Sequence, residues 1–169
     1  MSLIRFAFPL ASLAAGGMFM ASGSSRAELD FPMPAKDVVQ RLSGASRTVE
    51  GTGMGSLTLT GTGLDPRSVR ISVSRAGSRN RVKCTVNVAD ESETTSSATL
   101  DCTQTGAKTE AMNKIGGEAM AIVVSEHVRA VGLKQPYDID GVGDRMLAFV
   151  ARNAPLMAAQ MQPPGKAKN

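Results

Sequence analysis

The chain has 169 residues, a length suited to one domain, and its 42% hydrophobic and 20% charged residues are typical of a globular protein rather than a disordered one. Aromatic residues make up only 4% and Trp is absent, so the core must be built from aliphatic residues and Met. The net charge of +4 falls to +2 without Arg5 and Arg26 (4 − 2), which is too small to indicate nucleic-acid binding.

Residues 1–27 have the three-part pattern of a secretory signal peptide. Arg5 precedes an apolar run over residues 6–21, and Ser25 and Ala27 stand at the third and first positions before a suitable cleavage point. The alternative is an uncleaved membrane anchor, because the run approaches the roughly 17–20 residues that span a bilayer. Both interpretations place the remaining chain outside the cytoplasm, in the periplasm or secreted.

A short amphipathic helix is predicted over residues 35–43. Pro34 suits the start of a helix, and Gly44 suits the residue just beyond its end. Val38 and Leu42 are spaced to share one face, so this helix should bury one side and expose the other.

Four segments that alternate apolar and polar residues predict four strands joined in an antiparallel meander. The first strand reaches back to near Arg47, with glycines along one face. A turn at Gly77-Ser78 then pairs Val73 with Val82. The apolar positions of the four strands are Leu57 and Leu59; Val69, Ile71 and Val73; Val82, Cys84, Val86 and Val88; and Ala98, Leu100 and Cys102.

The same register sets Cys84 opposite Cys102 on the apolar face of the last hairpin. These are the only two cysteines, and an oxidising compartment outside the cytoplasm makes a disulfide durable. The alternative is a pair of reduced core cysteines. A zinc site would lack ligands, since no further Cys or His lies nearby in sequence. The sequence therefore predicts a disulfide and no metal.

A long helix over residues 108–131 supplies the cover that a one-sided sheet needs. Its broad apolar stripe contains Gly116-Gly117, which either permits close packing on the sheet or breaks the helix. A final helix over residues 140–153 is expected to end at Pro155, followed by a flexible tail over 156–169.

The predicted fold class is therefore α+β. It consists of a four-stranded antiparallel meander, a long helix packed on one face, a short N-terminal helix and a final helix, all within one domain over residues 28–155. No known family is recognised from these residues.

Catalytic and metal-binding patterns are weak throughout. His127 is the only histidine, and its sequence neighbours on a helix point to other sides, so it predicts no relay. The acids Asp138, Asp140 and Asp144 resemble part of a calcium loop, but its twelfth position would hold Phe149. Helix capping is the simpler role for these acids.

Carboxylates are available for a hydrolase, but no motif brings two of them together. The candidates are Asp101, Glu118 and Glu126. Hydrolysis is thus the weakest of the functional hypotheses, and no cofactor is expected.

The densest run of basic residues lies between residues 67 and 83, with no acid among its charges. Arg70, Arg81 and Lys83 should project from the solvent face of the sheet, and Arg79 from a turn. This predicts binding to an anionic surface. The alternative is a solvated face whose charges protect the sheet from aggregation. No aromatic residues interleave the bases, which disfavours nucleic acid.

The favoured hypothesis is an exported, non-enzymatic envelope protein that binds or scaffolds, with an anionic envelope component or another envelope protein as partner. Membrane contact is expected only through an uncleaved N-terminus. The alternative is a carrier of an apolar or lipid-like ligand in a cavity between sheet and long helix. Glycines at 51–55 and 116–117 would make room for that ligand.

Overall fold

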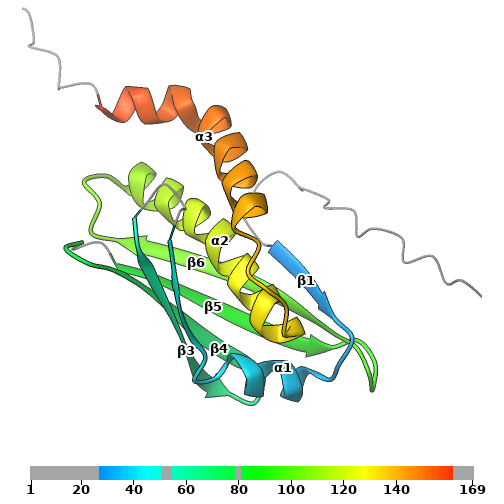
Figure 1. The fold of residues 1–169 in the computed structure, drawn as a ribbon. Coiled ribbons are helices and arrows are strands. Elements are labelled where there is room, and N and C mark those ends of the chain that lie inside the picture. Colours follow the sequence, from blue (N-terminus) through cyan, green and yellow to red (C-terminus); the bar gives the residue numbers. More distant parts are fainter. Residues whose placement is uncertain (1–26, 51–54, 79–80, 162–169) are drawn as a thin grey trace, which may run out of the picture.

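The computed structural model describes residues 27–50, 55–78 and 81–161, which form a curled antiparallel sheet with three helices (Figure 1). This confirms the α+β class, but the described sheet has six strands where four were predicted, in the order β1-β6-β5-β4-β3-β2. The strands are β1 (Ala27–Phe31), β2 (Ser46–Val49), β3 (Leu57–Asp65), β4 (Ser68–Arg75), β5 (Arg81–Asp90) and β6 (Ser96–Thr105). The helices are α1 (Ala35–Leu42), α2 (Glu110–Leu133) and α3 (Ile139–Met161).

The four predicted strands pair in the predicted register. Val73 faces Val82, and Val88 faces Ala98, so the alternating apolar residues share the inner face of the sheet. At the β4–β5 turn, the Ser78 N–H donates to the Arg75 carbonyl at 3.1 Å, while neighbouring residues 79–80 lie outside the described structure. The agreement follows because a slip of one residue would move an entire apolar set to solvent.

Two edge strands complete the sheet beyond the predicted meander. β1 pairs with β6, and its Leu29 lies opposite Ala98. β2 pairs antiparallel with β3, so the chain reverses between Val49 and Leu57 instead of continuing as one strand. The prediction of a single strand starting near Arg47 was therefore wrong. The predicted glycine-rich half of that strand includes residues 51–54, which lie outside the described residues.

Helix α1 lies at one end of the curled sheet (Figure 1). It confirms the short amphipathic helix predicted over residues 35–43, which was expected to bury one side. Its Val38 and Leu42 are fully buried. Gly44 follows with a φ of 80°, a left-handed conformation that glycine adopts without strain. The Arg41 guanidinium donates to the Gly132 carbonyl at 2.6 Å and so ties α1 to the last turns of α2.

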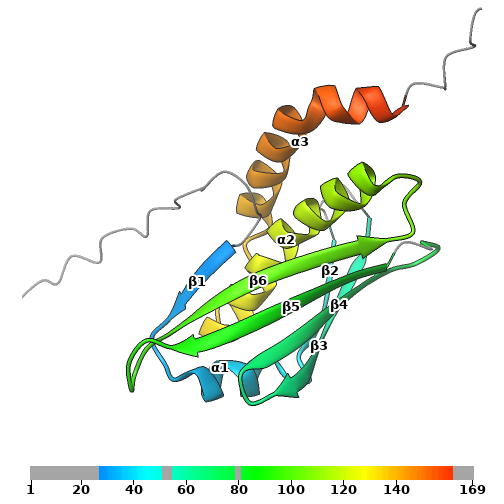
Figure 2. The ribbon, with the colours of Figure 1, turned by 180° about the vertical axis from the view of Figure 1, so that it is seen from behind.

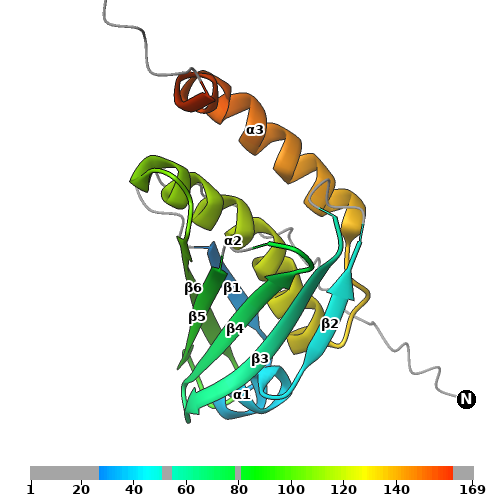
Figure 3. The same ribbon diagram turned by 90° about the vertical axis from the view of Figure 1, so that its left-hand side faces the viewer.

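Helix α2 crosses the concave face of the sheet, which curls around it (Figure 3). Gly116 and Gly117 lie inside the helix, so the glycine pair does not break it. A Cβ on Gly117 would lie 2.8 Å from the Cys102 carbonyl, and one on Gly116 would overlap the Gln104 amide. The two glycines therefore allow close packing of α2 on β6, the first of the two predicted alternatives.

Helix α3 packs on α2, which separates it from the sheet (Figures 1 and 3). The prediction that Pro155 ends this helix was wrong, because α3 contains Pro155 and continues to Met161. Within the described residues, no helix is both long enough and apolar enough to span a membrane. The predicted signal peptide lies almost wholly in residues 1–26, outside the described structure.

Candidate functional site

The predicted disulfide is present between β5 and β6. Cys84 and Cys102 are directly paired in the ladder, with their Cα atoms 4.0 Å apart and their sulfurs bonded at 1.99 Å. Cys84 is fully buried in the core, where it lies opposite Ile71 of β4. The bond closes a segment whose ends are 18 residues apart and links the two strands of the β5–β6 hairpin.

Replacing Cys84 and Cys102 together with Ala is expected to lower the free energy of unfolding by about 3 kcal/mol. A disulfide that closes a loop of roughly this length stabilises the folded protein by about that amount, because it lowers the conformational entropy of the unfolded chain. Chemical denaturation with and without a reductant measures the effect, and far-ultraviolet circular dichroism should show unchanged secondary structure. Identical stability of the natural chain under oxidising and reducing conditions would contradict the bond.

Three of the four predicted anion-binding residues lie together on the convex face of the sheet, the face turned toward the viewer in Figure 2. Arg70, Arg81 and Lys83 are all exposed, and the fourth candidate, Arg79, lies outside the described residues. In the register, Arg70 faces Thr85 while Lys83 faces Ser72, which makes the two bases diagonal neighbours. We call Arg70, Arg81 and Lys83 the convex basic patch.

Hydroxyl side chains surround the convex basic patch. Lys83 is flanked by Ser72 on β4 and by Thr103 on β6, and Arg70 is flanked by Thr62 and Thr85. Further hydroxyls follow on the same face toward β2, at Ser46, Thr48, Thr58 and Thr60. Such a surface offers cations and hydrogen-bond donors without large apolar groups, which suits a polar anionic ligand.

The charges of the convex basic patch have no carboxylate partners among the residues that the structure describes. No salt bridge there joins Arg70, Arg81 or Lys83 to an acid. The acidic residues of this face are Glu28 and Asp30 on β1 and Asp101 on β6, which faces Thr85 and is a diagonal neighbour of Lys83. The patch therefore forms no ion pair with a described carboxylate, although Asp101 partly offsets the charge of Lys83.

A buried ion cluster joins α2 to α3, and no local pattern in the sequence predicts it. The side chain of Glu126 is 1% exposed and lies 2.6 Å from the Arg129 guanidinium and 3.2 Å from that of Arg145. The Asp138 N–H also donates to this carboxylate at 3.0 Å. Burial alone would raise the pKa of Glu126, but these hydrogen bonds outweigh it and hold the pKa below its usual value.

His127 is fully buried beside this cluster on α2. Neither of its ring nitrogens has a hydrogen-bond partner among the described residues. Burial, with a smaller contribution from the positive charge of Arg47, lowers the pKa of His127 to about 4. The imidazole is therefore neutral at pH 7.

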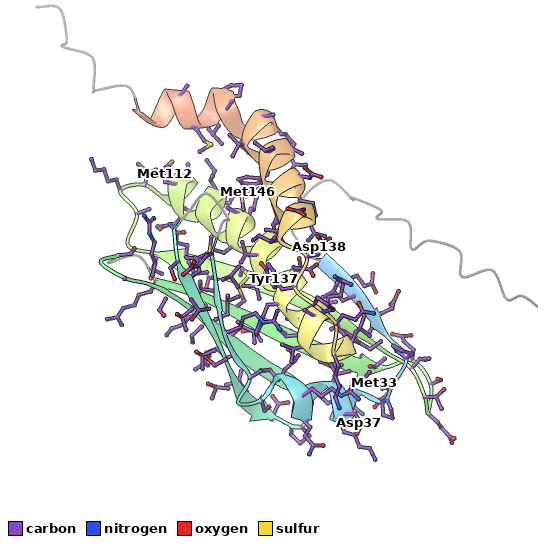
Figure 4. All side chains as sticks on the ribbon, in the orientation of Figure 1. Met33, Asp37, Met112, Tyr137, Asp138 and Met146 are labelled. Carbon is purple, nitrogen blue, oxygen red and sulfur yellow. A yellow bond between two sulfur atoms is a disulfide. The ribbon has the colours of Figure 1, made fainter. Side chains whose placement is uncertain are left out.

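Tyr137 lies in the connection between α2 and α3 (Figure 4). Its side chain contacts both α2 and Arg47 of the edge strand β2. Its hydroxyl donates to the Val123 carbonyl at 3.2 Å, and the Arg47 guanidinium lies 5.7 Å from the centre of its ring. Burial raises the pKa of Tyr137 to about 12. Arg47 lies opposite Leu59, so it projects toward the concave side of the sheet.

The acids that resembled a calcium loop act at the start of α3. The Asp138 carboxylate accepts from the Gly141 N–H at 2.9 Å, so Asp138 caps the start of α3. Among residues 27–50, 55–78 and 81–161, no group of three His, Cys, Asp or Glu side chains is placed to hold a metal ion. Of the hydrolase candidates, Glu126 is occupied by its arginines, while Asp101 lies on the convex face.

Comparison with known proteins gives no family. No family model matches the chain, and no curated protein is significantly similar to it in sequence.

Several solved structures resemble the fold loosely. The Aha1 dimer from Colwellia psychrerythraea shares 10% identity over 66% of this chain and 97% of that one, with a TM-score of 0.39. CalU16 from Micromonospora echinospora shares 12% identity over 79% of this chain and 85% of that one, also at 0.39. A conserved protein from Geobacillus kaustophilus shares 9% identity over 73% and 94%, at 0.40. Scores below 0.5 at such identities carry no functional argument, so function is argued from the geometry above.

Proposed function

We propose that this protein is an extracytoplasmic, non-enzymatic binding protein that holds an anionic polymer of the cell envelope on the convex face of its sheet. The observation that carries the proposal is the convex basic patch, whose three cations are flanked by hydroxyl side chains and form no ion pair with any carboxylate in the described part of the chain. The disulfide supports a location outside the cytoplasm, because such bonds persist in oxidising compartments.

The spacing of the cations favours a polymer over a small anion. Arg81 and Lys83 are two residues apart on one strand, which separates them by about 7 Å. Arg70 and Lys83 are diagonal neighbours on adjacent strands, at about 7–8 Å. A single phosphate or carboxylate is too small to bridge all three residues closely. A chain that repeats its charge at about this interval would engage them together.

Removing the three cations of the convex basic patch should weaken polymer binding on the order of a hundredfold at low salt, since each cation near an anionic surface contributes about 1 kcal/mol. The test is calorimetric titration of the Arg70→Ala/Arg81→Ala/Lys83→Ala variant with inorganic polyphosphate and with an acidic polysaccharide, at two salt concentrations. The two probes distinguish a phosphate polymer from a carboxylate polymer.

A control variant with the same net charge is Lys36→Ala/Lys108→Ala/Lys114→Ala, which removes three exposed lysines from other surfaces. We expect the control to bind as the natural chain does, and we expect its affinity to fall with added salt, because exposed charges are screened. If both variants lose the same affinity for the polymer, the loss depends only on the net charge of the protein and not on the convex basic patch. That result would overturn the proposal.

Carriage of an apolar ligand between α2 and the sheet is the second candidate. It is favoured by His127, a fully buried ring whose nitrogens have no hydrogen-bond partner among residues 27–50, 55–78 and 81–161. The space beside Gly116 and Gly117 was expected to hold a ligand, but residues of β6 occupy it. Native mass spectrometry of the exported protein tests this candidate, because a stable carrier would retain a co-purified lipid.

A further inference from the structure

The only histidine and the only tyrosine of the chain lie in one region, between α2 and the edge strand β2. The Tyr137 hydroxyl donates to the carbonyl of Val123, which lies one turn before His127 on the same side of α2. Arg47 projects inward from β2, with its guanidinium 5.7 Å from the centre of the Tyr137 ring. The positive charge of Arg47 also acts on His127 and helps to lower the pKa of that ring. We call Arg47, His127 and Tyr137 the concave polar cluster.

The charges around the concave polar cluster do not balance. Glu126 pairs with both Arg129 and Arg145. Asp138 adds a second negative charge, which acts on Arg129, so these two arginines are matched by two carboxylates. Arg47 is half-buried and forms no ion pair with any acid in the described part of the chain. One positive charge is therefore left over at the edge of an apolar interior, which favours an anionic ligand.

His127 carries a donor that its surroundings do not use. The residue is 0% exposed, and neither ring nitrogen has a hydrogen-bond partner among the residues that the structure describes. A neutral imidazole has one N–H donor and one acceptor, and buried groups of this kind are almost always hydrogen-bonded. A ligand oxygen beside Arg47 would accept from the ring N–H. The unmatched charge and the unused donor thus point to the same ligand, an oxygen anion.

We propose that the concave polar cluster binds a carboxylate, with Arg47 pairing with its charge and His127 donating a ring N–H to one of its oxygens. A carboxylate carries the single negative charge that balances Arg47, and its two oxygens match the planar fork of a guanidinium. It belongs either to a small acid or to the head of a fatty acid. The site is separate from the convex face of the proposed polymer binding, and it supplies headgroup chemistry for the ligand of the second candidate function.

The carboxylate would enter at the open edge of the sheet. β2 is the last strand in the order of the described sheet, so no further strand lies beyond Arg47. His127 is fully buried, so a ligand reaches its ring only when a neighbouring side chain moves. We expect Tyr137 to move, because it lies in the connection between α2 and α3 and not within a helix or strand. Binding should exchange the contact between Tyr137 and Arg47 for one between Arg47 and the ligand.

The natural side chains report on this site, because the chain has one Tyr, one His and no Trp. The test is titration of the natural chain at pH 7 with acetate and, below its micelle concentration, with laurate. We expect a saturable change in Tyr137 emission, together with a shift of the His127 imidazole signals in the nuclear magnetic resonance spectrum. Saturation by laurate alone would identify a fatty acid as the ligand, and saturation by both acids would identify a small carboxylate. The proposal fails if neither signal changes with either acid.

Arg47→Met should weaken carboxylate binding by on the order of tenfold or more, because it removes a charge-assisted donor and keeps most of the side-chain length. The matched control is Arg152→Met, which makes the same change in net charge at an exposed arginine 5.9 Å from the centre of the Phe149 ring. The control should bind the acid as the natural chain does. Equal weakening in the two variants would attribute binding to net charge and contradict the proposal.

His127→Leu tests the ring N–H separately, because the imidazole is neutral at pH 7 and the net charge is unchanged. We expect this variant to bind the acid more weakly than the natural chain. Unchanged affinity would show that His127 donates no hydrogen bond to the ligand, against the proposal.

The carboxylate site and the proposed function can fail independently. The triple alanine variant of the convex basic patch should bind the acid normally, and Arg47→Met should bind the polymer normally. If the natural chain binds the polymer but neither acid, only the carboxylate site is wrong. If it binds an acid but no polymer, only the proposed function is wrong.

Discussion

Replacing both Arg129 and Arg145 with Met is expected to lower the free energy of unfolding at pH 7 by about 3–5 kcal/mol, the cost of leaving a buried charge without its partners. The Glu126 carboxylate would remain 1% exposed, with only the Asp138 N–H to stabilise its charge. Met keeps most of the arginine length, so the loss reports on charge more than on packing. Urea denaturation measures it.

The matched control is Arg152→Met, which removes an arginine from α3 that has no carboxylate partner among the described residues. Adding Glu126→Met to the double variant should recover much of the lost stability, because an apolar set of similar volume replaces a buried ion cluster at little cost. No recovery in the triple variant would mean that the arginines act by packing. The ion-cluster interpretation would then be wrong.

The sequence was sufficient to predict the central sheet because several local signals agree there. Period-two alternation, the turn at Gly77 and the opposed cysteines each require the same register, and a slip would expose a whole apolar set. The outcome in the structure is the Cys84–Cys102 bond and the pairing of Val86 with Leu100.

The edge strands could not be assigned in the same way. β1 does alternate, with Leu29 and Phe31 against Glu28 and Asp30, but it directly follows the expected cleavage point and has only five residues. β2 has only four residues. Its Val49 is an even number of residues from Leu57, so the alternation continues through the intervening glycines and predicts one continuous strand. Its antiparallel pairing depends on tertiary contacts that the local pattern does not contain.

The candidate site was predictable only where it depends on strand geometry. Alternation placed Arg70, Arg81 and Lys83 on the solvent face, and the sheet confirms that they are exposed there. The ion cluster was not predictable, because Glu126 and Arg145 are 19 residues apart and meet only when α3 folds back on α2. Pro155 gave a misleading signal for the end of α3, since context can retain a proline within a helix.

The folded protein is expected to lose stability on acidification between pH 6.5 and pH 4, with a slope set by the difference in His127 protonation between the unfolded and folded states. Its pKa is about 4 in the fold and about 6.5 when unfolded, so the unfolded state binds the proton first. The contribution is complete above pH 6.5 and disappears as the pH falls toward 4. At 1.36 kcal/mol per pKa unit, the whole difference is about 3.4 kcal/mol.

His127→Leu removes this titration while keeping an apolar side chain in the same buried position. Urea denaturation from pH 7.5 to pH 4 should therefore show a much flatter stability curve for the variant than for the natural chain. The pKa of Glu126 is lowered from 4.5, so its own contribution is lost only at more acidic pH and does not overlap this window strongly. Parallel curves for the two proteins would show that His127 is hydrated or hydrogen-bonded in the fold. Its pKa would then not be lowered, because the lowering depends on desolvation of the ring.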